Sequence, residues 1–411
     1  MPATLSVAVA VLGAGPVGAT FACLLAEAGV PTAVIDRAAL PPMELPEFDG
    51  RAYAIARTSR DVLAEAGVWA RLGSNPCPIT RIRVSDGRPG ERASPLTLTF
   101  DAPEAEVDAF GWMVEARHLR IALNAHLPRI PGLAVFAPAR ATLLQRDATG
   151  VGLRLDDGTT ITAQLLVAAE GRESATRAAA GIPVTRWDYG QDAMVCAVRH
   201  DRPHEHVAIE HFLPAGPFAI LPLPGEGGDR RTSAVVWTER RAEAERIWRL
   251  DPPRFARELR RRFGDHWGAV TPVGLRWRYP LGALLAHRYT DTRLALVGDA
   301  AHGIHPIAGQ GLNLGFRDVG ALGRLVIDAV RAGRDPGARD LLAAYQAERR
   351  PANLLMLAAT DALDRLFSTD FAPLRLIRDL GLAAVDRMPG LKRVFMRTAM
   401  GFSPLGALRA A

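Results

Sequence analysis

The sequence predicts an α/β fold in which a parallel sheet covered by helices is interrupted by a second, mostly antiparallel sheet and followed by a helical C-terminal region. Three observations predict this fold. A strand–helix–strand pattern opens the chain, short strands separated by Pro and Gly turns fill residues 182–276, and helical periodicity begins at residue 311. A chain of 411 residues is long enough for two or three subdomains.

The first 36 residues form one strand–helix–strand unit. Ser6–Leu12 is an apolar, β-branched run typical of a strand that is buried on both faces. A helix is expected from Gly15 to about Gly29, and a second strand over Thr32–Ile35. Residues 1–26 carry no charged side chain, but glycines interrupt the run and no basic residue precedes it. We therefore expect neither a membrane span nor a signal peptide here.

Further elements follow from local patterns. Alternating apolar residues predict meander strands at Thr142–Gln145, Gly152–Leu155 and Thr159–Ala163, with a hairpin turn at Asp157-Gly158, and an apolar strand at Leu165–Ala169. In the inserted sheet we expect strands at Ala193–Arg199, Val207–Phe212, Phe218–Leu223 and Ser233–Thr238. A buried strand at Leu294–Val297 and helices over 311–332 and 337–366 complete the chain.

These elements predict a division into domains. A Rossmann-like cofactor domain is expected over 1–181 and 277–345, with part of 76–110 joining the other sheet. The substrate-binding β-sheet domain is expected over 182–276, and a C-terminal helical region over 346–411.

Composition excludes several function classes. Hydrophobic residues make up 48% and charged residues 23%, which excludes an intrinsically disordered chain. The three cysteines have no CxxC spacing, which argues against a zinc site or a disulfide framework and favours a reduced compartment. Lys392 is the one lysine of the chain. The other basic residues are arginines, and the net charge of only +6 does not indicate nucleic-acid binding.

The first chemical motif is the GxGxxG run Gly13-Ala14-Gly15-Pro16-Val17-Gly18 between the first strand and the first helix. Its glycines permit a tight turn and bring backbone N–H groups close to a pyrophosphate. Asp36, at the end of the second strand, is placed to bind ribose hydroxyls. A glycine turn that only packs helix on strand would explain the glycines but not the acid. The motif predicts a dinucleotide site and does not choose between FAD and NAD.

A second cluster favours FAD. The strand Leu294–Val297 runs into Gly298-Asp299, and a glycine-rich loop from His305 opens the helix at about residue 311. Asp299 is placed to hold a ribityl hydroxyl. The positive end of the helix would then point at a flavin ring and stabilise its anionic reduced form.

These motifs resemble a known family. The stretch HPIAGQGLNLGFRD over residues 305–318 is similar to the signature of flavoprotein aromatic hydroxylases of the p-hydroxybenzoate hydroxylase fold, in the branch that serves ubiquinone biosynthesis. Asp49–Ala52, Trp187–Gln191 and Phe212–Pro217 also match. The resemblance covers essentially the whole chain.

The resemblance implies a set of cofactor-binding residues: Gly13, Gly15, Pro16, Val17, Gly18, Asp36, Arg37, Arg51, Arg117, Asp299, Pro306, Gly309, Gln310, Gly311, Leu312 and Asn313. It places Arg51 along the cofactor near the flavin, and Gly309 to Asn313 against the pyrimidine edge of the ring. One position departs from the family pattern. The second fingerprint, which usually reads Asp-Gly and serves both FAD and NAD(P)H, is Glu170-Gly171 here.

The resemblance also implies a reaction. NAD(P)H, or a partner reductase, would reduce the flavin, O2 would add to give a C4a-hydroperoxide, and the distal oxygen would attack the ring of a polyprenylated phenol. No residue is expected to be catalytic, because the flavin carries the chemistry. For His302 and His305 a structural role is favoured over proton transfer. Phe212, Pro217 and Leu221 are candidates either for the ring pocket or for sheet core.

The tail allows more than one interpretation. Apolar residues of 373–400, from Leu374 to Met400, alternate with six basic residues, as in a helix that binds an anionic membrane surface or a partner groove. A helix that closes the protein's own core is equally compatible. The expected location is therefore the cytoplasm, with peripheral contact at the inner membrane and with other ubiquinone-biosynthesis proteins left open. Two further functions stay open: hydroxylation of a soluble aromatic compound, and a non-catalytic scaffold in a biosynthetic complex.

Overall fold

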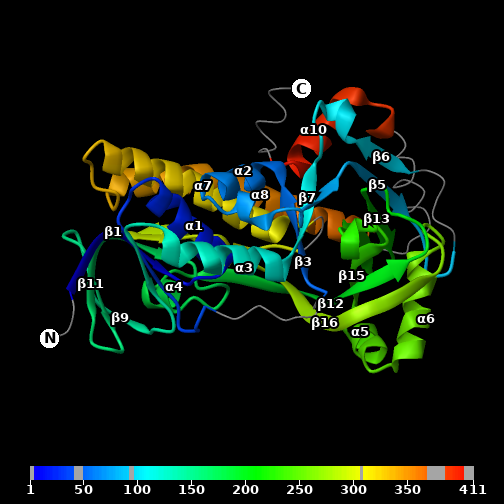
Figure 1. Ribbon diagram of the computed structural model, residues 1–411, viewed down its shortest axis with the longest axis horizontal. Helices are drawn as coiled ribbons and strands as arrows, with labels where there is room; N and C mark the ends of the chain where they lie inside the picture. The colour runs from blue at the N-terminus through cyan, green and yellow to red at the C-terminus, as the bar shows by residue number, and fades with distance from the viewer. Residues whose placement is uncertain (1–3, 41–49, 92–96, 306–308, 368–384, 402–411) are drawn as a thin grey trace.

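A computed structural model describes residues 4–40, 50–91, 97–305, 309–367 and 385–401 of the chain. Figure 1 shows two lobes, with the first and last described segments on opposite sides of the molecule. Helices and three sheets make up both lobes, so the predicted α/β class with an inserted, mostly antiparallel sheet is confirmed.

The first sheet holds the N-terminal unit. Its central strands are parallel, in the order β18 (Leu294–Leu296), β11 (Thr160–Ala168), β1 (Thr4–Leu12), β2 (Thr32–Ile35) and β8 (Leu133–Phe136). β17 (Thr290–Asp291), β10 (Val151–Leu155) and β9 (Ala141–Arg146) add antiparallel edges. The two apolar runs expected at Thr159–Ala163 and Leu165–Ala169 form the single strand β11. Strand β2 is buried at every position, as a strand covered on both faces requires.

Four helices cover or flank this sheet: α1 (Pro16–Glu27), α3 (Ala116–His126), α4 (Ala175–Ala179) and α7 (Gln310–Arg331). α7 packs on α1 and on the long helix α8 (Arg339–Phe367), which contains Pro351. The bounds of α7 and α8 agree with the two helices expected over 311–332 and 337–366. Short 3-10 turns lie at Trp69–Leu72, Ala102–Ala105, Leu127–Arg129, Glu226–Gly228 and Gly298–Ala300.

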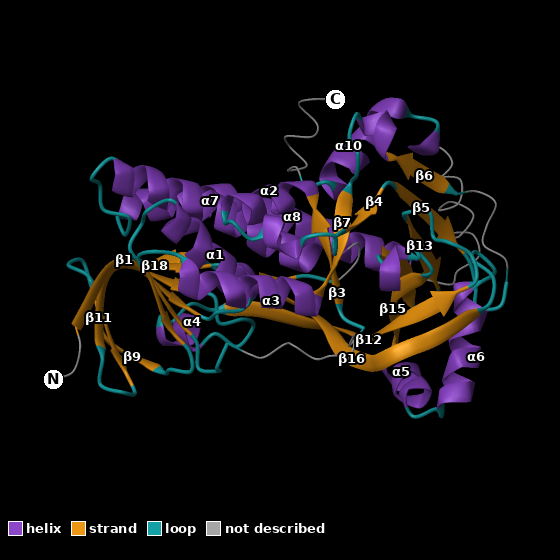
Figure 2. Cartoon of the chain, viewed as in Figure 1, coloured by secondary structure: helices purple, strands orange, loops and turns teal. Residues whose placement is uncertain are grey.

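The second sheet has the order β19 (His302–Gly303), β16 (Val270–Ala286), β12 (Val184–His200), β15 (Thr232–Arg240), β14 (Gly216–Leu223), β13 (Val207–Leu213), β5 (Arg81–Asp86) and β6 (Leu98–Asp101). All neighbours are antiparallel except β13 and β5. One face packs on α5 (Arg241–Trp248) and α6 (Pro252–Phe263), which lie on the side away from β3 and β7 in Figure 2. Segments 81–86 and 98–101 thus belong to this sheet, while the predicted domain boundaries stay a prediction.

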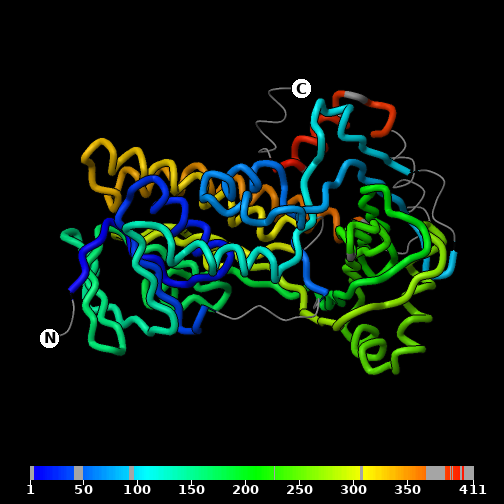
Figure 3. Tube along the Cα trace, viewed as in Figure 1, coloured from blue at the N-terminus to red at the C-terminus, as the bar shows by residue number. Residues whose placement is uncertain are grey.

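The strand β16 was not predicted as one element. It runs beside β12 for 17 residues, and Figure 3 traces the two segments next to each other. Pro272, Gly274, Pro280 and Gly282 interrupt its sequence and would ordinarily indicate turns. Pro272, Pro280 and Gly282 nevertheless pair directly with Val198, Asp192 and Asp188 of β12. Only Gly274 lies in a register shift, where residues 274–276 of β16 stand opposite Cys196.

A third, small sheet joins the two lobes. It consists of β3 (Ala52–Ala56), β7 (Gly111–Glu115) and β4 (Cys77–Ile79), and α2 (Arg57–Glu65) follows β3. Side chains of β3 and β4 pack against β13, β14 and β15 of the second sheet. The small sheet therefore forms a wall between the cofactor lobe and the inner face of the large antiparallel sheet.

The described part of the tail closes the protein's own core. Helix α10 (Pro389–Ala399) and the residue after it bury Met396 and Met400 against Phe100 and Phe212. Lys392 Nζ lies 2.8 Å from Glu104 Oε2. Leu374, Ile377 and Leu380 fall outside the described residues. None of the described helices has both the length and the apolar character needed to cross a bilayer.

Candidate cofactor and substrate site

The first glycine motif forms a tight turn between β1 and α1. Gly13 has a φ of +102°, and a Cβ atom there would lie 2.5 Å from the carbonyl oxygen of Ala169. A Cβ atom at Gly18 would lie 2.0 Å from the carbonyl oxygen of Gly13. At Gly15 a Cβ atom would meet nothing within 4 Å, and no side chain caps the helix N-terminus there. Two glycines thus pack the turn, and the third leaves open surface where a phosphate group fits.

Asp36 lies beside this turn, as the spacing predicts. Its Oδ2 accepts a hydrogen bond from the Ala14 N–H at 2.7 Å, and its Oδ1 accepts one from Ala38 at 2.9 Å. The neighbouring Arg37 is exposed. On the other side, Arg120 of α3 donates to the carbonyl oxygen of Ala14 at 2.6 Å. Sequence reasoning missed Arg120, because no motif marks a residue that reaches the turn from a helix 106 positions away.

The two glycine-rich motifs meet at Val17. Its side chain lies 2.6 Å from a Cβ atom built at Gly315 of α7 and 3.2 Å from one built at Gly298. The side chain of Val17 is therefore packed between the motifs, not turned into open space. Asp299, next to Gly298, is about half exposed and lies 3.3 Å from the Nε atom of Arg172. The packing of Val17 against Gly298 and Gly315 brings both predicted cofactor segments to one edge of the first sheet.

The N-terminus of α7 is fixed on β3. Gly309, the residue before the helix, has a φ of +64°, and a Cβ atom there would lie 2.9 Å from that of Ala54. The side chain of Asn313 accepts from the Ala56 N–H at 2.8 Å and donates to the carbonyl oxygens of Ala54 and Gly309. A Cβ atom at Gly311 would meet nothing within 4 Å. The backbone of this turn is thus exposed, while Asn313 braces it.

The remaining predicted cofactor residues differ in burial and in their contacts. Gln310 is buried and accepts from Arg317 at 3.1 Å, and Leu312 packs against the core of the first lobe. The guanidinium of Arg51 lies 4.6 Å from the ring centre of Trp277 on β16. Arg117 Nε lies 2.7 Å from Glu115 Oε2. Pro306 falls outside the described residues.

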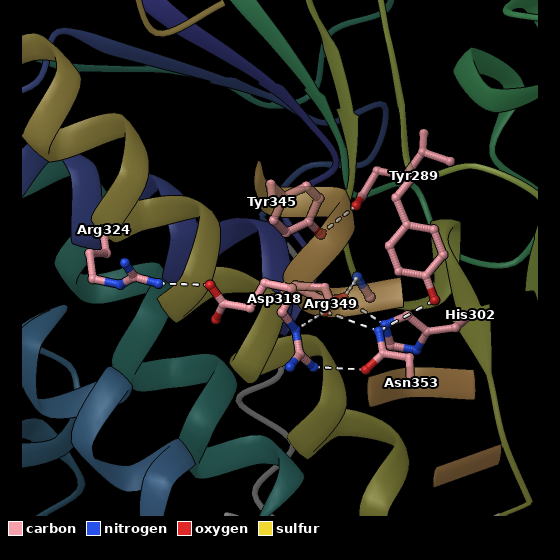
Figure 4. Close-up of polar contacts among 10 residues, drawn as sticks. Tyr289, His302, Asp318, Arg324, Tyr345, Arg349 and Asn353 are labelled. Atoms are coloured by element: carbon pink, nitrogen blue, oxygen red, sulfur yellow. Dashed lines mark hydrogen bonds and ion pairs between the residues drawn. The ribbon is translucent and has the colours of Figure 1, made fainter. Parts of the chain in front are cut away.

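A buried polar network supports the turn at Gly298, and Figure 4 shows its side chains around Asp318. Asp318 of α7 accepts from the Gly298 N–H at 3.0 Å, lies 2.5 Å from His302 Nε2 and lies 2.9 Å from Arg349 Nε. Asn353 donates to the same carboxylate at 3.2 Å. Burial raises the pKa of Asp318, but the charges of His302 and Arg349 outweigh it and lower the pKa to about 2. His302 thus braces the loop.

His305 borders a pocket between α8 and the second sheet. Its ring lies edge-on to Tyr189 at 5.0 Å, and its Nε2 atom lies 3.6 Å from Asp364 Oδ1. Burial lowers the pKa of His305, while Asp364 opposes this shift. The pocket has a volume of about 900 Å³, and Tyr189, Gln191, Pro214, Leu357, Asp361 and Asp364 are among its lining residues. Charged side chains line much of this pocket, unlike the mostly apolar walls of a typical site for an aromatic ring.

The three candidates for the ring pocket share one face of the second sheet. Phe212 and Pro217 are paired residues of β13 and β14, and Leu221 lies four residues further along β14. Phe212 packs in the cluster of α10, whereas Leu221 packs beside Ala52 and Ala54 of β3. Both interpretations therefore apply in part: Phe212 belongs to a core cluster, and Leu221 lies close to the α7 N-terminus.

The unusual fingerprint Glu170-Gly171 caps a helix. Glu170 Oε2 accepts from Ser174 Oγ at 2.7 Å and from the Thr176 N–H at 3.2 Å, at the start of α4. Arg177 of α4 donates to the carbonyl oxygen of Ala300 at 2.9 Å. The longer carboxylate is thus accommodated beside the Asp299 loop.

Comparisons with known proteins agree with this arrangement. The model of the FAD binding domain family matches residues 6–360. The chain belongs to this family of flavoprotein monooxygenases. It is 51% identical over 398 residues to the ubiquinone hydroxylase UbiL of Rhodospirillum rubrum, covering 97% of this chain and 90% of that protein. It is 33% identical to the 3-demethoxyubiquinol 3-hydroxylase of Escherichia coli, covering 96% of this chain and 98% of that protein.

Solved structures show the same fold. The p-nitrophenol 4-monooxygenase PnpA of Pseudomonas putida matches with a TM-score of 0.77 and 17% identity, over 97% of this chain and 98% of that chain. PqsL of P. aeruginosa in complex with 2-aminobenzoylacetate matches with a TM-score of 0.75 and 26% identity, over 92% and 99%. The predicted family and fold are thereby confirmed.

The residues present fit FAD. Two helix N-termini, those of α1 and α7, lack a side-chain cap, and the space beside Gly15 and Gly311 is open. The first is suited to a pyrophosphate and the second to the electron-rich edge of a flavin. Asp36 and Asp299 are placed where their carboxylates would meet the ribose and ribityl hydroxyls of that cofactor. FAD is therefore the cofactor of this family member.

Proposed function

We propose that the protein is an FAD-dependent monooxygenase that hydroxylates the aromatic ring of a polyprenylated phenol in ubiquinone biosynthesis, with electrons from NAD(P)H or a partner reductase and with O2 as co-substrate. The observation that carries the proposal is the open, uncapped N-terminus of α7 beside β3, next to the inner face of the antiparallel sheet. The names of the similar ubiquinone hydroxylases support the substrate class.

The protein's own residues have a limited set of tasks in this reaction. FAD, when bound, supplies the redox chemistry and the activation of O2. Gly15 and the N-terminus of α1 receive its pyrophosphate, and the backbone N–H groups from Gly309 to Leu312 stabilise negative charge on the flavin ring. Asn313 and Asp318 keep these two segments in place through β3 and the Gly298 turn. The sheet face and the small sheet exclude water from the ring.

The departure at Glu170 bears on the electron donor. Because its carboxylate is engaged by Ser174 and Thr176, it is less available to a nicotinamide cofactor than a shorter, free acid. Reduction rates of the FAD-loaded protein with NADH, with NADPH and with a reductase-containing extract distinguish the donors.

The experiment that tests the function is mass spectrometry of quinone lipids from cells that lack the gene. Accumulation of a prenylated ring that is one oxygen short is expected, and its structure identifies the hydroxylated carbon. An unchanged ubiquinone profile would favour a soluble aromatic substrate. A purified protein that shows no flavin absorption after FAD titration would favour the scaffold alternative.

We further propose peripheral membrane contact through the outer side of α10. Met388 is 53% and Phe395 45% exposed, and the basic side chains Arg387 and Arg393 are exposed beside them. Apolar and basic side chains together favour an anionic lipid surface. Flotation with anionic liposomes, comparing the wild type with Met388→Ser/Phe395→Ser, tests this; equal flotation of the two contradicts it.

A further inference from the structure

A row of side chains crosses the inner face of the second sheet. Residues that pair directly across strands point to the same face. The row, here called the cross-strand row, consists of Val84 on β5, Glu210 on β13, Ala219 on β14, Val236 on β15, Val195 on β12 and Trp277 on β16. All of its members except Ala219 keep part of their surface accessible, although β13, β14 and β15 are otherwise mostly buried. The row therefore borders space that the described residues leave unfilled.

This space lies on the cofactor side of the sheet. The opposite face, with Ile209, Phe218 and Trp237, packs on α5 and α6. At one end of the row, Trp277 lies under the guanidinium of Arg51 at 4.6 Å. Leu221, next to the row on β14, packs in the cluster that contains Ala54, and Ala54 touches the α7 N-terminus at Gly309. The row thus leads to the segments that receive the flavin.

Glu210 is the acidic member of an otherwise apolar row. On β13 it is the one residue that is not fully buried, and its carboxyl group nevertheless lies deep inside the protein. No described residue forms a hydrogen bond or ion pair with it. Burial alone raises the pKa of Glu210 to about 7. A buried acid without a partner is uncommon in folded proteins and points to a ligand group that it meets.

Other titratable groups around this face have partners of their own. Asp86 on β5 lies level with Phe212 and accepts from the Gly87 N–H at 2.8 Å. Asp364 of α8 is contacted by Gln191 at 3.4 Å, and Cys77 of β4 lies 3.6 Å from a His206 nitrogen. Arg51 is at the far end of the row. The neighbouring His211 points to the other face, where Ser85 contacts it at 2.8 Å.

We propose, on the basis of the function proposed above, that Glu210 accepts the hydroxyl proton of the phenol substrate. In this step the phenolic O–H bond breaks, an O–H bond forms on the carboxylate, and the electron pair stays on the phenolate oxygen, so that no redox change occurs. The phenolate delocalises negative charge into the ring and makes it a better nucleophile. The proton returns from the carboxylic acid to the product oxygen at the end.

The raised pKa of Glu210 favours this role. A phenol hydroxyl has a pKa near 10 and an ordinary glutamate near 4.3, which leaves a large gap for proton transfer. A carboxylate whose pKa is about 7 reduces that gap while staying ionised in slightly alkaline solution. The cross-strand row supplies apolar side chains against which an aromatic ring can pack.

The test uses the FAD-loaded, oxidised protein without an electron donor, and 4-methylphenol labelled with 13C at the hydroxyl-bearing carbon as the probe. In the wild type at pH 8, the resonance of the bound probe is expected to be displaced part of the way toward its phenolate value, because its hydroxyl group donates a hydrogen bond to the ionised carboxylate. The displacement is lost as the pH falls through about 7. In Glu210→Gln the displacement is expected to be absent at every pH below the pKa of the free probe. In Glu210→Asp part of the displacement should remain.

Glu205→Gln is the matched control, because the same chemical change is made five residues away on an exposed loop side chain. It is expected to leave the displacement unchanged. Turnover of Glu210→Gln is expected to fall by about 10²- to 10⁴-fold, as for loss of a general base. Bound probe with the same resonance in wild type and Glu210→Gln overturns the role of Glu210 and leaves the proposed function standing. A wild-type protein that binds no phenol at all overturns both.

Discussion

Asn313 of α7 and Ala56 at the end of β3 are 257 positions apart in sequence and are joined by a 2.8 Å hydrogen bond. The same side chain also donates to the carbonyl oxygens of Ala54 and Gly309. A single amide thus connects the wall of the substrate space to the turn that would hold the flavin. The family signature includes this asparagine, and the structure shows that its side chain supports the turn.

The substitution Asn313→Ala is expected to destabilise the protein by about 1–3 kcal/mol, because buried backbone groups lose their partner. FAD affinity should fall as well, since the α7 N-terminus is released from β3. Chemical denaturation and fluorescence titration with FAD measure the two effects. The partly exposed Asn75, whose side chain donates to the carbonyl oxygen of Leu72, is the control as Asn75→Ala. Unchanged FAD affinity in Asn313→Ala would show that the turn holds its shape unaided.

The substitution Gly15→Ala separates folding from cofactor binding. Gly15 has an ordinary φ of −62°, and a Cβ atom there meets nothing within 4 Å, so the cofactor-free protein should fold normally. The added methyl group would occupy the place of the pyrophosphate. We expect FAD binding to weaken by about tenfold or more, equivalent to about 1.4 kcal/mol. Gly390→Ala on α10, also in open space, should leave FAD affinity intact.

The substitution Asp318→Asn tests the buried network of Figure 4. It leaves the buried Arg349 without a charged partner, which typically costs about 3–5 kcal/mol. In the wild type the pKa of Asp318 is lowered to about 2, so its stabilising contribution is present above about pH 4 and is lost as the pH falls toward 2. Urea denaturation between pH 7 and pH 3 should show this acid-side loss in the wild type and a much weaker one in Asp318→Asn.

The raised pKa of Glu210 predicts the opposite dependence of protein stability on pH. Its pKa is raised in the folded state, so the folded protein holds a proton that the unfolded chain releases between about pH 4 and 7. Stability from this group therefore decreases as the pH rises through that window. At pH 8, Glu210→Gln should increase the free energy of unfolding by roughly 3 kcal/mol. At pH 4 the two proteins should unfold alike. A destabilised variant at pH 8 would mean that the carboxylate has a partner in solution.

The sequence was most informative where local chemistry decides structure. The glycines at 13, 15 and 18 and the buried strand Thr32–Ile35 were predictable, because turn geometry and burial leave a direct signal in residue type. The helices α7 and α8 followed from their periodicity. Periodicity alone placed the start of α7 at residue 311, one residue late. The family resemblance added the turn before the helix.

Long-range relationships were not predictable in the same way. Pro272 and Pro280 concealed β16, because both pair directly with residues of the partner strand β12, and that pairing leaves no local signal. Arg120 reaches the Ala14 carbonyl from another helix, and no local pattern marks it. Glu210 was not singled out within the expected strand Val207–Phe212. Its surroundings depend on strand register and on which face of the sheet is accessible, and neither can be inferred from the local sequence. The helices α5 and α6 were missed although their own sequences are helical in pattern, because the whole of 182–276 was interpreted as a sheet domain.

The ion pair between Lys392 and Glu104 has a practical consequence. Because the chain contains one lysine, an amine-directed fluorophore can attach to only one side chain besides the α-amino group. That lysine is largely covered and lies 2.8 Å from Glu104 when α10 is docked. The rate of labelling thus reports how often α10 leaves the body of the enzyme. Acetylation of the same amine would remove its ion pairs with Glu104 and Asp386, which leaves the burial of Met396 and Met400 to hold the C-terminal helix.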